Sequence, residues 1–397
     1  MIDLNLQLIK GGLKKIQWLY GINAWWKSRH AKNQYSNTVR CYGQRAPAAA
    51  FDELLSGRLG MRRAPFTNRA GALNIFYLGT DELQDRSGIL QSLKRQGNLS
   101  YFTQADGRYG QYIGGTDEQR MAANADRLLA LFRDLHARNQ TPHLLIAQTF
   151  AYVIDPAVFT EIRDTYGTLV VNIAMDDRHQ YWGWKINGKW GGACGLIPHV
   201  DLVLTAAPEC VDWYLKEGCP AMFFPEASDP EIFHPMPDLP KLHDVCFVGR
   251  RYGIREKIVL ALRQAGIKVA AYGDGWEDGH MEVEGVPRLF AQSRIVLGIG
   301  TIGHSTDMYA LKMRDFDGPM SGSCYLTHDN PDLSLLFRVG KELQTYRSTS
   351  DCVSKARYLL ANDREREAIA SAGACVAKRD HTWQKRFQQL LSVLEAK

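Results

Sequence analysis

Residues 295–327 have the sequence IVLGIGTIGHSTDMYALKMRDFDGPMSGSCYLT, with a short apolar run at each end. The first run ends in glycine and the second follows Gly322, so both predict strands, and the polar segment between them predicts a helix over 306–318. Such a unit brings the carboxyl end of a strand and the start of a helix to one edge of a parallel sheet. Backbone N–H groups and cations can meet an anion at that edge. The segment therefore predicts a cleft that binds a phosphate-bearing ligand.

The rest of the chain alternates short apolar strands with helices, which is typical of doubly wound parallel sheets. Strands are predicted at 73–79, 99–104, 143–148, 169–175, 201–207, 221–227, 244–250, 267–273, 295–300 and 324–327. Helices are predicted at 88–96, 117–139, 155–165, 208–217, 255–265, 287–293, 351–361, 363–378 and 381–395. Four prolines in 226–242 indicate an interdomain linker. The predicted fold class is α/β, with two facing Rossmann-like domains over 71–228 and 241–380 and a cleft between them.

Length and composition favour a soluble protein of more than one domain. A chain of 397 residues is too long for one compact core. No apolar run approaches the roughly 20 residues that span a bilayer, and the N-terminus lacks the apolar region and cleavage site of a signal peptide. The eight cysteines are scattered without a C-x-x-C pair, which favours reduced thiols. These features predict a cytoplasmic protein.

Residues 1–70 form a basic extension that differs in charge from the rest of the chain. They hold 12 Lys/Arg and 3 Asp/Glu, a net charge of +9, whereas the remaining residues hold 36 and 40, a net charge of −4. Apolar side chains recur at helical spacing through the first part of this segment, at Leu6, Ile9, Leu13, Ile16 and Tyr20. A basic amphipathic helix could dock, peripherally, on an anionic membrane surface or on nucleic acid. It could equally pack on the globular body with a solvated basic face.

Cations and glycines follow the first two strands of the C-terminal half, at the edge where α/β sheets bind ligands. Arg250 comes directly after a strand-ending glycine and Arg255 opens the next helix, so both could bind a diphosphate through the guanidinium fork. The alternative is a solvated helix start. Gly273 and Gly275 permit close approach of a nucleotide, and Trp276 could stack on its base or belong to a plain turn with a core indole.

The central segment adds two further cations and two loop residues. Lys312 and Arg314 are predicted to bind the diphosphate, although they could instead form salt bridges with Asp315 and Asp317 on a helix surface. The other two are His304, a candidate catalytic group, and Ser305, a candidate contact to the donor sugar.

Two carboxylates follow a strand of the N-terminal half and are candidate catalytic residues. Asp176 and Asp177 come after VVNIAM, a position that suits a general base or contacts to hydroxyls. Hard oxygen ligands would also suit magnesium. His179 and Trp182 follow in an aromatic, glycine-rich stretch, where they could contact an acceptor or a sugar, or the stretch could cap a core.

Several short motifs of the C-terminal half occur in a recognisable order. They are FVGR at 247–250 with Arg255 following, YGxGW at 272–276, KxRxFD at 312–317, Gly322 with the strand after it, and His381-Thr382 before the last helix. Together they resemble the CgeB-like glycosyltransferases, whose fold is the two-domain GT-B. The resemblance covers roughly residues 240–395; over 71–240 it extends only to the order of elements, and it does not include 1–70.

The resemblance carries its own expectations for individual residues. In the wider GT-B pattern an acidic residue, with a glycine five positions later, binds the ribose hydroxyls of the donor, and Asp317 with Gly322 matches that spacing. Asp317 stands where glutamate is usual. Related retaining families often have a second glutamate eight positions earlier, where this chain has Tyr309, so the contact to the sugar ring and the stereochemistry stay open. A final helical segment, 381–397, is expected to pack back toward the N-terminal domain.

The implied activity is that of a hexosyltransferase-type glycosyltransferase. It would move a sugar from a nucleotide diphosphate sugar, bound by the C-terminal domain, to an acceptor hydroxyl near the N-terminal domain. The resemblance implies no resident cofactor and no metal, with the nucleotide sugar as co-substrate. Two alternatives remain: a non-catalytic nucleotide- or sugar-binding protein on the same fold, and a transferase acting on a modified nucleic-acid base.

Overall fold

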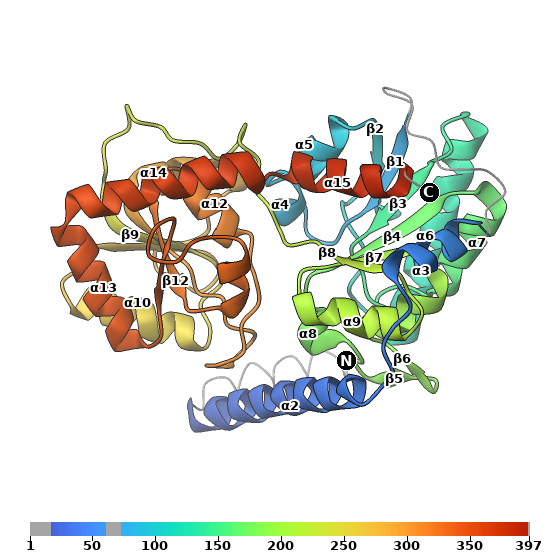
Figure 1. The fold of residues 1–397 in the computed structure, drawn as a ribbon, viewed down its shortest axis with the longest axis horizontal. Helices are drawn as coiled ribbons and strands as arrows, with labels where there is room; N and C mark the ends of the chain where they lie inside the picture. The colour runs from blue at the N-terminus through green and yellow to red at the C-terminus, as the bar shows by residue number, and fades with distance from the viewer. Residues whose placement is uncertain (1–16, 61–72, 396–397) are drawn as a thin grey trace.

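The computed structural model describes residues 17–60 and 73–395, and these form two α/β domains, each built on a parallel sheet (Figure 1). The sheet of the N-terminal domain has the strand order β2-β1-β3-β4-β7-β8. Its strands are β1 (Asn74–Leu78), β2 (Asn98–Tyr101), β3 (Leu144–Ala147), β4 (Leu169–Ala174), β7 (Leu202–Thr205) and β8 (Ala221–Phe223). Its helices are α4 (Glu82–Asp85), α5 (Ile89–Lys94), α6 (Asp117–Ala137), α7 (Ala157–Tyr166), α8 (Asp177–Gln180), the 3₁₀ helix η1 (Ala193–His199) and α9 (Pro208–Lys216).

The C-terminal domain repeats this architecture with the strand order β10-β9-β11-β12-β13. Its strands are β9 (His243–Val248), β10 (Val269–Tyr272), β11 (Ser293–Leu297), β12 (Cys324–His328) and β13 (Gln344–Tyr346). Its helices are α10 (Ile254–Gln264), η2 (Val283–Gly285), α11 (Val286–Ala291), α12 (Arg314–Met320), η3 (Pro331–Leu335), α13 (Thr349–Ala361) and α14 (Asp363–Asp380). A short hairpin, β5 (Lys185–Ile186) and β6 (Lys189–Trp190), lies outside both sheets.

Both faces of the N-terminal sheet are buried. Alternate side chains of one strand point to opposite faces of the sheet, and each face packs against its own set of helices. In β1, Phe76 packs with Phe132 of α6, whereas Tyr77 packs on the other face with side chains of α5 and of α15 (Trp383–Glu395). The central strand β4 is buried along its whole length, which explains why its sequence is apolar except at Asn172. The last helix therefore belongs to the core of the N-terminal domain, although α14 before it packs on the C-terminal domain (Figure 1).

The chain crosses between the domains at two places, and the two crossings are hydrogen bonded to each other. The amide of Ser228 donates to the carbonyl of His381 at 3.0 Å, and the amide of Trp383 donates to the carbonyl of Ser228 at 3.0 Å. The buried guanidinium of Arg386 donates to the carbonyl of Pro225 at 3.2 Å. The backbone around residues 225–228 is thus held from both sides, at the edge of the interdomain cleft.

Helix α2 (Gln17–Gly43) runs beneath both domains and contacts each of them (Figure 1). Near its end, Tyr42 is fully buried against the N-terminal domain, while Lys32 forms an ion pair with Asp307 of the C-terminal domain. Helix α3 (Phe51–Gly60) follows it and buries Leu55. These described parts of the basic extension pack on the globular body. This agrees with the second of the two alternatives that the sequence left open. Four of the predicted apolar helix positions, Leu6, Ile9, Leu13 and Ile16, lie outside the described residues.

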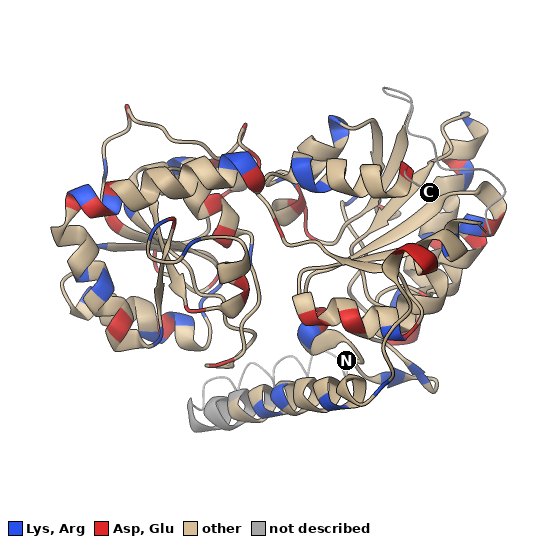
Figure 2. Cartoon of the chain, in the orientation of Figure 1, with Lys and Arg blue, Asp and Glu red and all other residues tan. Residues whose placement is uncertain are grey.

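Lysine and arginine residues recur along α2 (Figure 2). Arg29 and Arg40 are exposed there, as are Trp25 and Trp26, each at 59%. In the described part of the chain, no helix combines the length and the apolar character needed to cross a membrane.

The structure corrects one predicted element and adds short ones that the sequence did not predict. The helix predicted over 306–318 begins only at Arg314, because Ser305 closes a turn: its hydroxyl accepts hydrogen bonds from the amides of Asp307 and Met308. Lys312 therefore lies in a loop rather than on a helix. Strand β13 was not predicted, since its three residues form too short and too polar a run to stand out.

Candidate active site between the two domains

A cavity of about 420 Å³ lies between the carboxyl edges of the two sheets. Its lining residues on the N-terminal side are Asp81, Leu83, Gln84, Ser87, Gln148, Met175, Asp176 and Glu226. Those from the C-terminal side include Val248, Gly249, Arg250, Gly273, Asp274, His280, Met281, Val283, Val286, Phe290, Lys312, Met313, Arg314 and Asp317. Six of the residues predicted from sequence meet here: Asp176, Arg250, Gly273, Lys312, Arg314 and Asp317.

Two guanidinium groups of the described chain lie on the C-terminal side of the cavity without carboxylate partners: Arg314 lines the cavity, whereas Arg255 lies near the lining residue Gly249 and does not itself line it. Among the described residues neither Arg314 nor Arg255 forms an ion pair, and the Nε and Nη2 atoms of Arg314 are buried without a hydrogen-bond partner. Burial lowers the pKa of Arg255 to about 10, and the neighbouring Arg314 adds to this effect. The Nη1 atom of Arg255 donates to the carbonyl of Arg250 at 3.1 Å, but its Nε has no partner. Unsatisfied, positively charged donors at a cavity wall are suited to binding an anion.

Gly249 permits this arrangement of cations. A Cβ at this position would lie 3.2 Å from Nη1 of Arg314 and 3.5 Å from Nη1 of Arg255, and the backbone has φ +151. A side chain would therefore be strained and would press on the guanidinium of Arg314. Arg250, the next residue, lines the cavity with a side chain that is 70% exposed and 3.3 Å from Asp274.

Three ionisable groups meet where the two domains face each other: Lys312, Asp176 and Glu226. The Nζ atom of Lys312 lies 3.4 Å from Oδ1 of Asp176 on the opposite domain. Burial works against protonation of Lys312, but the carboxylates of Asp176 and Glu226 outweigh it and raise the pKa of the lysine. In turn Lys312 lowers the pKa of Asp176. This pair is therefore charged near neutral pH.

The alternative in which Lys312 and Arg314 pair with the acids of their own segment does not describe the structure. The carboxylate of Asp315 accepts hydrogen bonds from the backbone amide of Lys312 at 2.8 Å and from the hydroxyl of Tyr325 at 2.6 Å. It thus positions the loop that carries Lys312. Asp317 lines the cavity, and burial raises its pKa well above the ordinary value.

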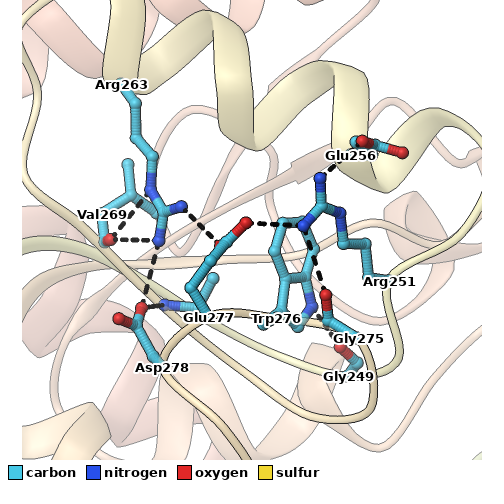
Figure 3. A network of polar contacts seen from close by, with 10 residues as sticks. Gly249, Arg251, Glu256, Arg263, Val269, Gly275, Trp276, Glu277 and Asp278 are labelled. Atoms are coloured by element: carbon cyan, nitrogen blue, oxygen red, sulfur yellow. Dashed lines mark hydrogen bonds and ion pairs between the residues drawn. The ribbon is translucent and has the colours of Figure 1, made fainter.

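Trp276 belongs to a network of polar contacts in the C-terminal domain (Figure 3) and does not line the cavity, which corrects its prediction as a base-stacking residue. Its side chain is buried and its Nε1 donates to the carbonyl of Gly249 at 2.7 Å. Arg251 lies over the ring and donates to the carbonyl of Gly275 at 3.2 Å. Ion pairs from Arg251 and Arg263 to Glu277 complete the network. Trp276 and Gly275 thus fix the two glycine loops to each other behind the ligand site.

Asp177 also lies away from the cavity, although Asp176 beside it lines the wall. Asp177 is fully buried, and its Oδ2 accepts hydrogen bonds from Thr205 at 2.7 Å and Tyr214 at 3.1 Å. Burial raises its pKa to about 7. Asp177 is therefore a core group of the N-terminal domain, and the prediction that it shares a catalytic role with Asp176 is corrected.

The next residue, Arg178, joins the two domains, a role that the sequence analysis missed. Its guanidinium donates to both carboxylate oxygens of Glu209, at 2.6 and 2.7 Å. It also donates to the carbonyl of Tyr309 at 2.6 Å and lies 2.8 Å from Oδ2 of Asp332, both in the C-terminal domain. His179 is half-buried near Asp176 and Lys312; burial lowers its pKa, and its Nδ1 has no hydrogen-bond partner.

Three further predicted residues have other surroundings than the cavity. Trp182 lies under α2, where its Nε1 donates to Thr38 at 2.9 Å and its ring stacks on Tyr42. Ser305 closes the turn described above and is buried. His304 packs against the ring of Tyr252 and does not line the cavity. The predicted sugar or acceptor contacts of Trp182 and Ser305, and the catalytic role of His304, are corrected accordingly.

Glu226 is the cavity residue of most chemical interest that the sequence analysis missed. Its side chain is only 4% exposed, its Oε2 has no hydrogen-bond partner, and burial raises its pKa to about 7. Glu226 follows the last apolar strand of its domain, as Asp176 follows β4, so position after a strand was the available signal. Within the described residues, no group of three or more His, Cys, Asp or Glu side chains is placed to hold a metal ion.

Comparison with known proteins agrees with this arrangement of two domains. Sucrose-phosphate synthase from Thermosynechococcus elongatus is similar to 82% of this chain over 98% of its own length, with a TM-score of 0.60 and 10% sequence identity. The HepE protein of Anabaena, in complex with UDP and glucose, matches 82% of this chain over 100% of its own length, with a TM-score of 0.58 and 12% identity. The fold is GT-B.

Two further comparisons complete this result. A glycosyltransferase from Rickettsia africae matches 82% of this GT-B chain over 98% of its own length, with a TM-score of 0.54 and 8% identity. Residues 250–392 match the family model described as glycosyl transferase-like, a range that includes Arg250, Lys312 and Arg314. Comparison with curated proteins found no match.

Proposed function

We propose that this GT-B protein is a glycosyltransferase that moves a sugar from a nucleotide diphosphate sugar to an acceptor hydroxyl. The observation that carries the proposal is the guanidinium of Arg314, which lines the interdomain cavity with two buried nitrogen atoms that lack hydrogen-bond partners and has the cation Arg255 as a neighbour. Transfer from a nucleotide diphosphate sugar leaves negative charge on the departing diphosphate, and fixed cations stabilise that charge. The match of residues 250–392 to a glycosyl transferase-like family supports the same activity.

The remaining lining residues suit the other parts of such a donor. Met281, Val286 and Phe290 offer an apolar surface to a nucleobase. Asp317 is the candidate for the ribose hydroxyls. HepE of Anabaena has been solved with UDP-glucose, which makes UDP and UDP-glucose the first ligands to test. We further assign the chain to the CgeB-like group and to hexosyl transfer, on the order of the C-terminal motifs.

On the acceptor side, Asp176 is the candidate general base. It lines the cavity from the N-terminal domain and is kept charged by Lys312, 3.4 Å away. A charged carboxylate can accept the proton of the acceptor hydroxyl as the new glycosidic bond forms. Lys312, which pairs with Asp176 and lines the same cavity as Arg314, would stabilise both the carboxylate and the leaving diphosphate.

Replacing Arg314 or Lys312 by alanine should weaken UDP binding on the order of 10- to 100-fold. A hydrogen bond to a charged group contributes about 1.5–3 kcal/mol. Calorimetric titration of each variant with UDP measures the change, and Lys257→Ala is the matched control, because Lys257 is exposed and lies outside the cavity. Affinity equal to that of the wild type in both variants would exclude the diphosphate role.

We expect EDTA to leave the release of UDP from UDP-glucose unchanged. Arg255, Lys312 and Arg314 are fixed cations, and they can neutralise a leaving diphosphate without a divalent ion. The measurement compares turnover before and after chelation, with magnesium or manganese added back. Activity that is lost on chelation and restored by the metal would contradict this expectation and would turn attention to Asp176 as a ligand.

A further inference from the structure

Tyr309 occupies the position where the GT-B pattern often has a sugar-binding glutamate, and its surroundings give it a different role. Its hydroxyl donates to the carbonyl of Thr306 at 3.2 Å, and its own carbonyl accepts the hydrogen bond from Arg178. Tyr309 does not line the cavity. The transferred sugar must therefore find its polar contacts elsewhere in the cleft.

Glu226 is the carboxyl group best placed to supply such a contact. It lines the same cavity as Lys312 and Arg314, but from the opposite domain. It is 96% buried, since only 4% of the residue is exposed, and its Oε2 lacks any hydrogen-bond partner. Leaving a buried polar group unsatisfied costs free energy, and a hydroxyl of a bound ligand would remove that cost.

The position of Glu226 is also fixed by its neighbours along the chain. The carbonyl of Pro225 accepts a hydrogen bond from Arg386, and the backbone of Ser228 is bonded on both sides to the segment that leads into α15. A carboxyl group on so firmly held a segment is pre-organised, as recognition of a defined hydroxyl requires. The charged groups that act on it are Lys312, Asp176, Asp315 and Arg386.

We propose that Glu226 binds a hydroxyl group of the transferred sugar and so distinguishes the nucleotide sugar from the free nucleotide. This inference rests on the proposed function, since it presupposes a diphosphate bound at Arg314 and Arg255. Glu226 is one of the two carboxylates whose charge acts on Lys312, and the other is Asp176, the candidate general base. The ligand group that Glu226 would contact is a neutral sugar ring that carries hydroxyl groups.

The test compares two ligands on each protein. Calorimetric titration with UDP and UDP-glucose, ADP and ADP-glucose, and GDP and GDP-mannose identifies the pair that the wild-type protein binds. For that pair, Glu226→Ala should keep its affinity for the diphosphate within about twofold and lose on the order of 10-fold in affinity for the nucleotide sugar. Glu226→Gln keeps the shape and neutral hydrogen bonding, so its loss should be smaller. Glu284→Ala, which removes an exposed glutamate of the same cleft region, is the control.

The outcomes separate this inference from the proposed function. If the wild-type protein binds none of the three pairs, the proposed function fails and this inference fails with it. If the wild type binds a pair and Glu226→Ala leaves the ratio of the two affinities unchanged, the inference alone is overturned. If Glu226 has only a structural role, its replacement lowers both affinities together and leaves their ratio unchanged. Should Glu226→Ala not fold, Glu226→Gln decides by the same ratio.

Discussion

Replacing Asp176 by asparagine should lower turnover on the order of 10²- to 10⁴-fold, the usual contribution of a general base. Asparagine keeps the size of the side chain and its contact with Lys312 but cannot accept the acceptor's proton. The diphosphate site lies on the other domain, so affinity for UDP should change far less than turnover. The measurement is kcat for sugar transfer, or for hydrolysis of the nucleotide sugar where no acceptor is at hand, together with UDP affinity.

Asp177→Asn is the matched control for this experiment. Asp177 is adjacent in sequence but buried among Thr205 and Tyr214, and burial raises its pKa to about 7. An amide in its place should alter the free energy of unfolding while leaving the kcat of the folded protein within a few-fold of the wild type. A loss of turnover in Asp177→Asn as large as in Asp176→Asn would contradict the assignment of the base to Asp176.

The contrast between these two neighbours shows how far sequence could predict the site. Position after an apolar strand located Asp176, Lys312 and Arg314 at the cleft, because all parallel strands of a sheet end at one edge. Position along the chain does not determine the direction of a side chain. Asp177 opens the short helix α8, where successive residues point in different directions, so one faces the cavity and the next the core.

Contacts between distant segments explain the other corrections. Trp276 and Trp182 were predicted to meet a ligand because each is an aromatic residue among glycines. In the structure the indole nitrogen of Trp276 donates to Gly249, and that of Trp182 donates to Thr38, 144 positions away. Nothing in the sequence around Gly249 or Thr38 indicates that the residue accepts a hydrogen bond from a tryptophan. The strands of the two sheets other than β13, by contrast, were predictable one by one, because each lies in a local run of apolar residues.

The last prediction concerns α2, whose basic sequence suggested a docking segment as well as a packed helix. Tyr42→Ala should destabilise the protein by about 3–5 kcal/mol, the usual effect of removing a large aromatic side chain from a core. Tyr42 is fully buried, its ring stacks on Trp182 and Trp213, and its hydroxyl donates to Glu217 at 2.6 Å. The midpoint of urea unfolding, followed by tryptophan fluorescence, measures the change.

Two further variants separate the contributions of Tyr42. Tyr42→Phe removes only the hydroxyl, which leaves its partners Glu217 and Tyr181 without that contact, so it should cost about 1–3 kcal/mol. Val39→Ala, on the same helix but 43% exposed, should have little effect. If Tyr42→Ala were no less stable than Val39→Ala, α2 would not be part of the N-terminal core. Its aromatic and basic residues would then have to be explained by a partner, because the free energy of folding would not depend on them.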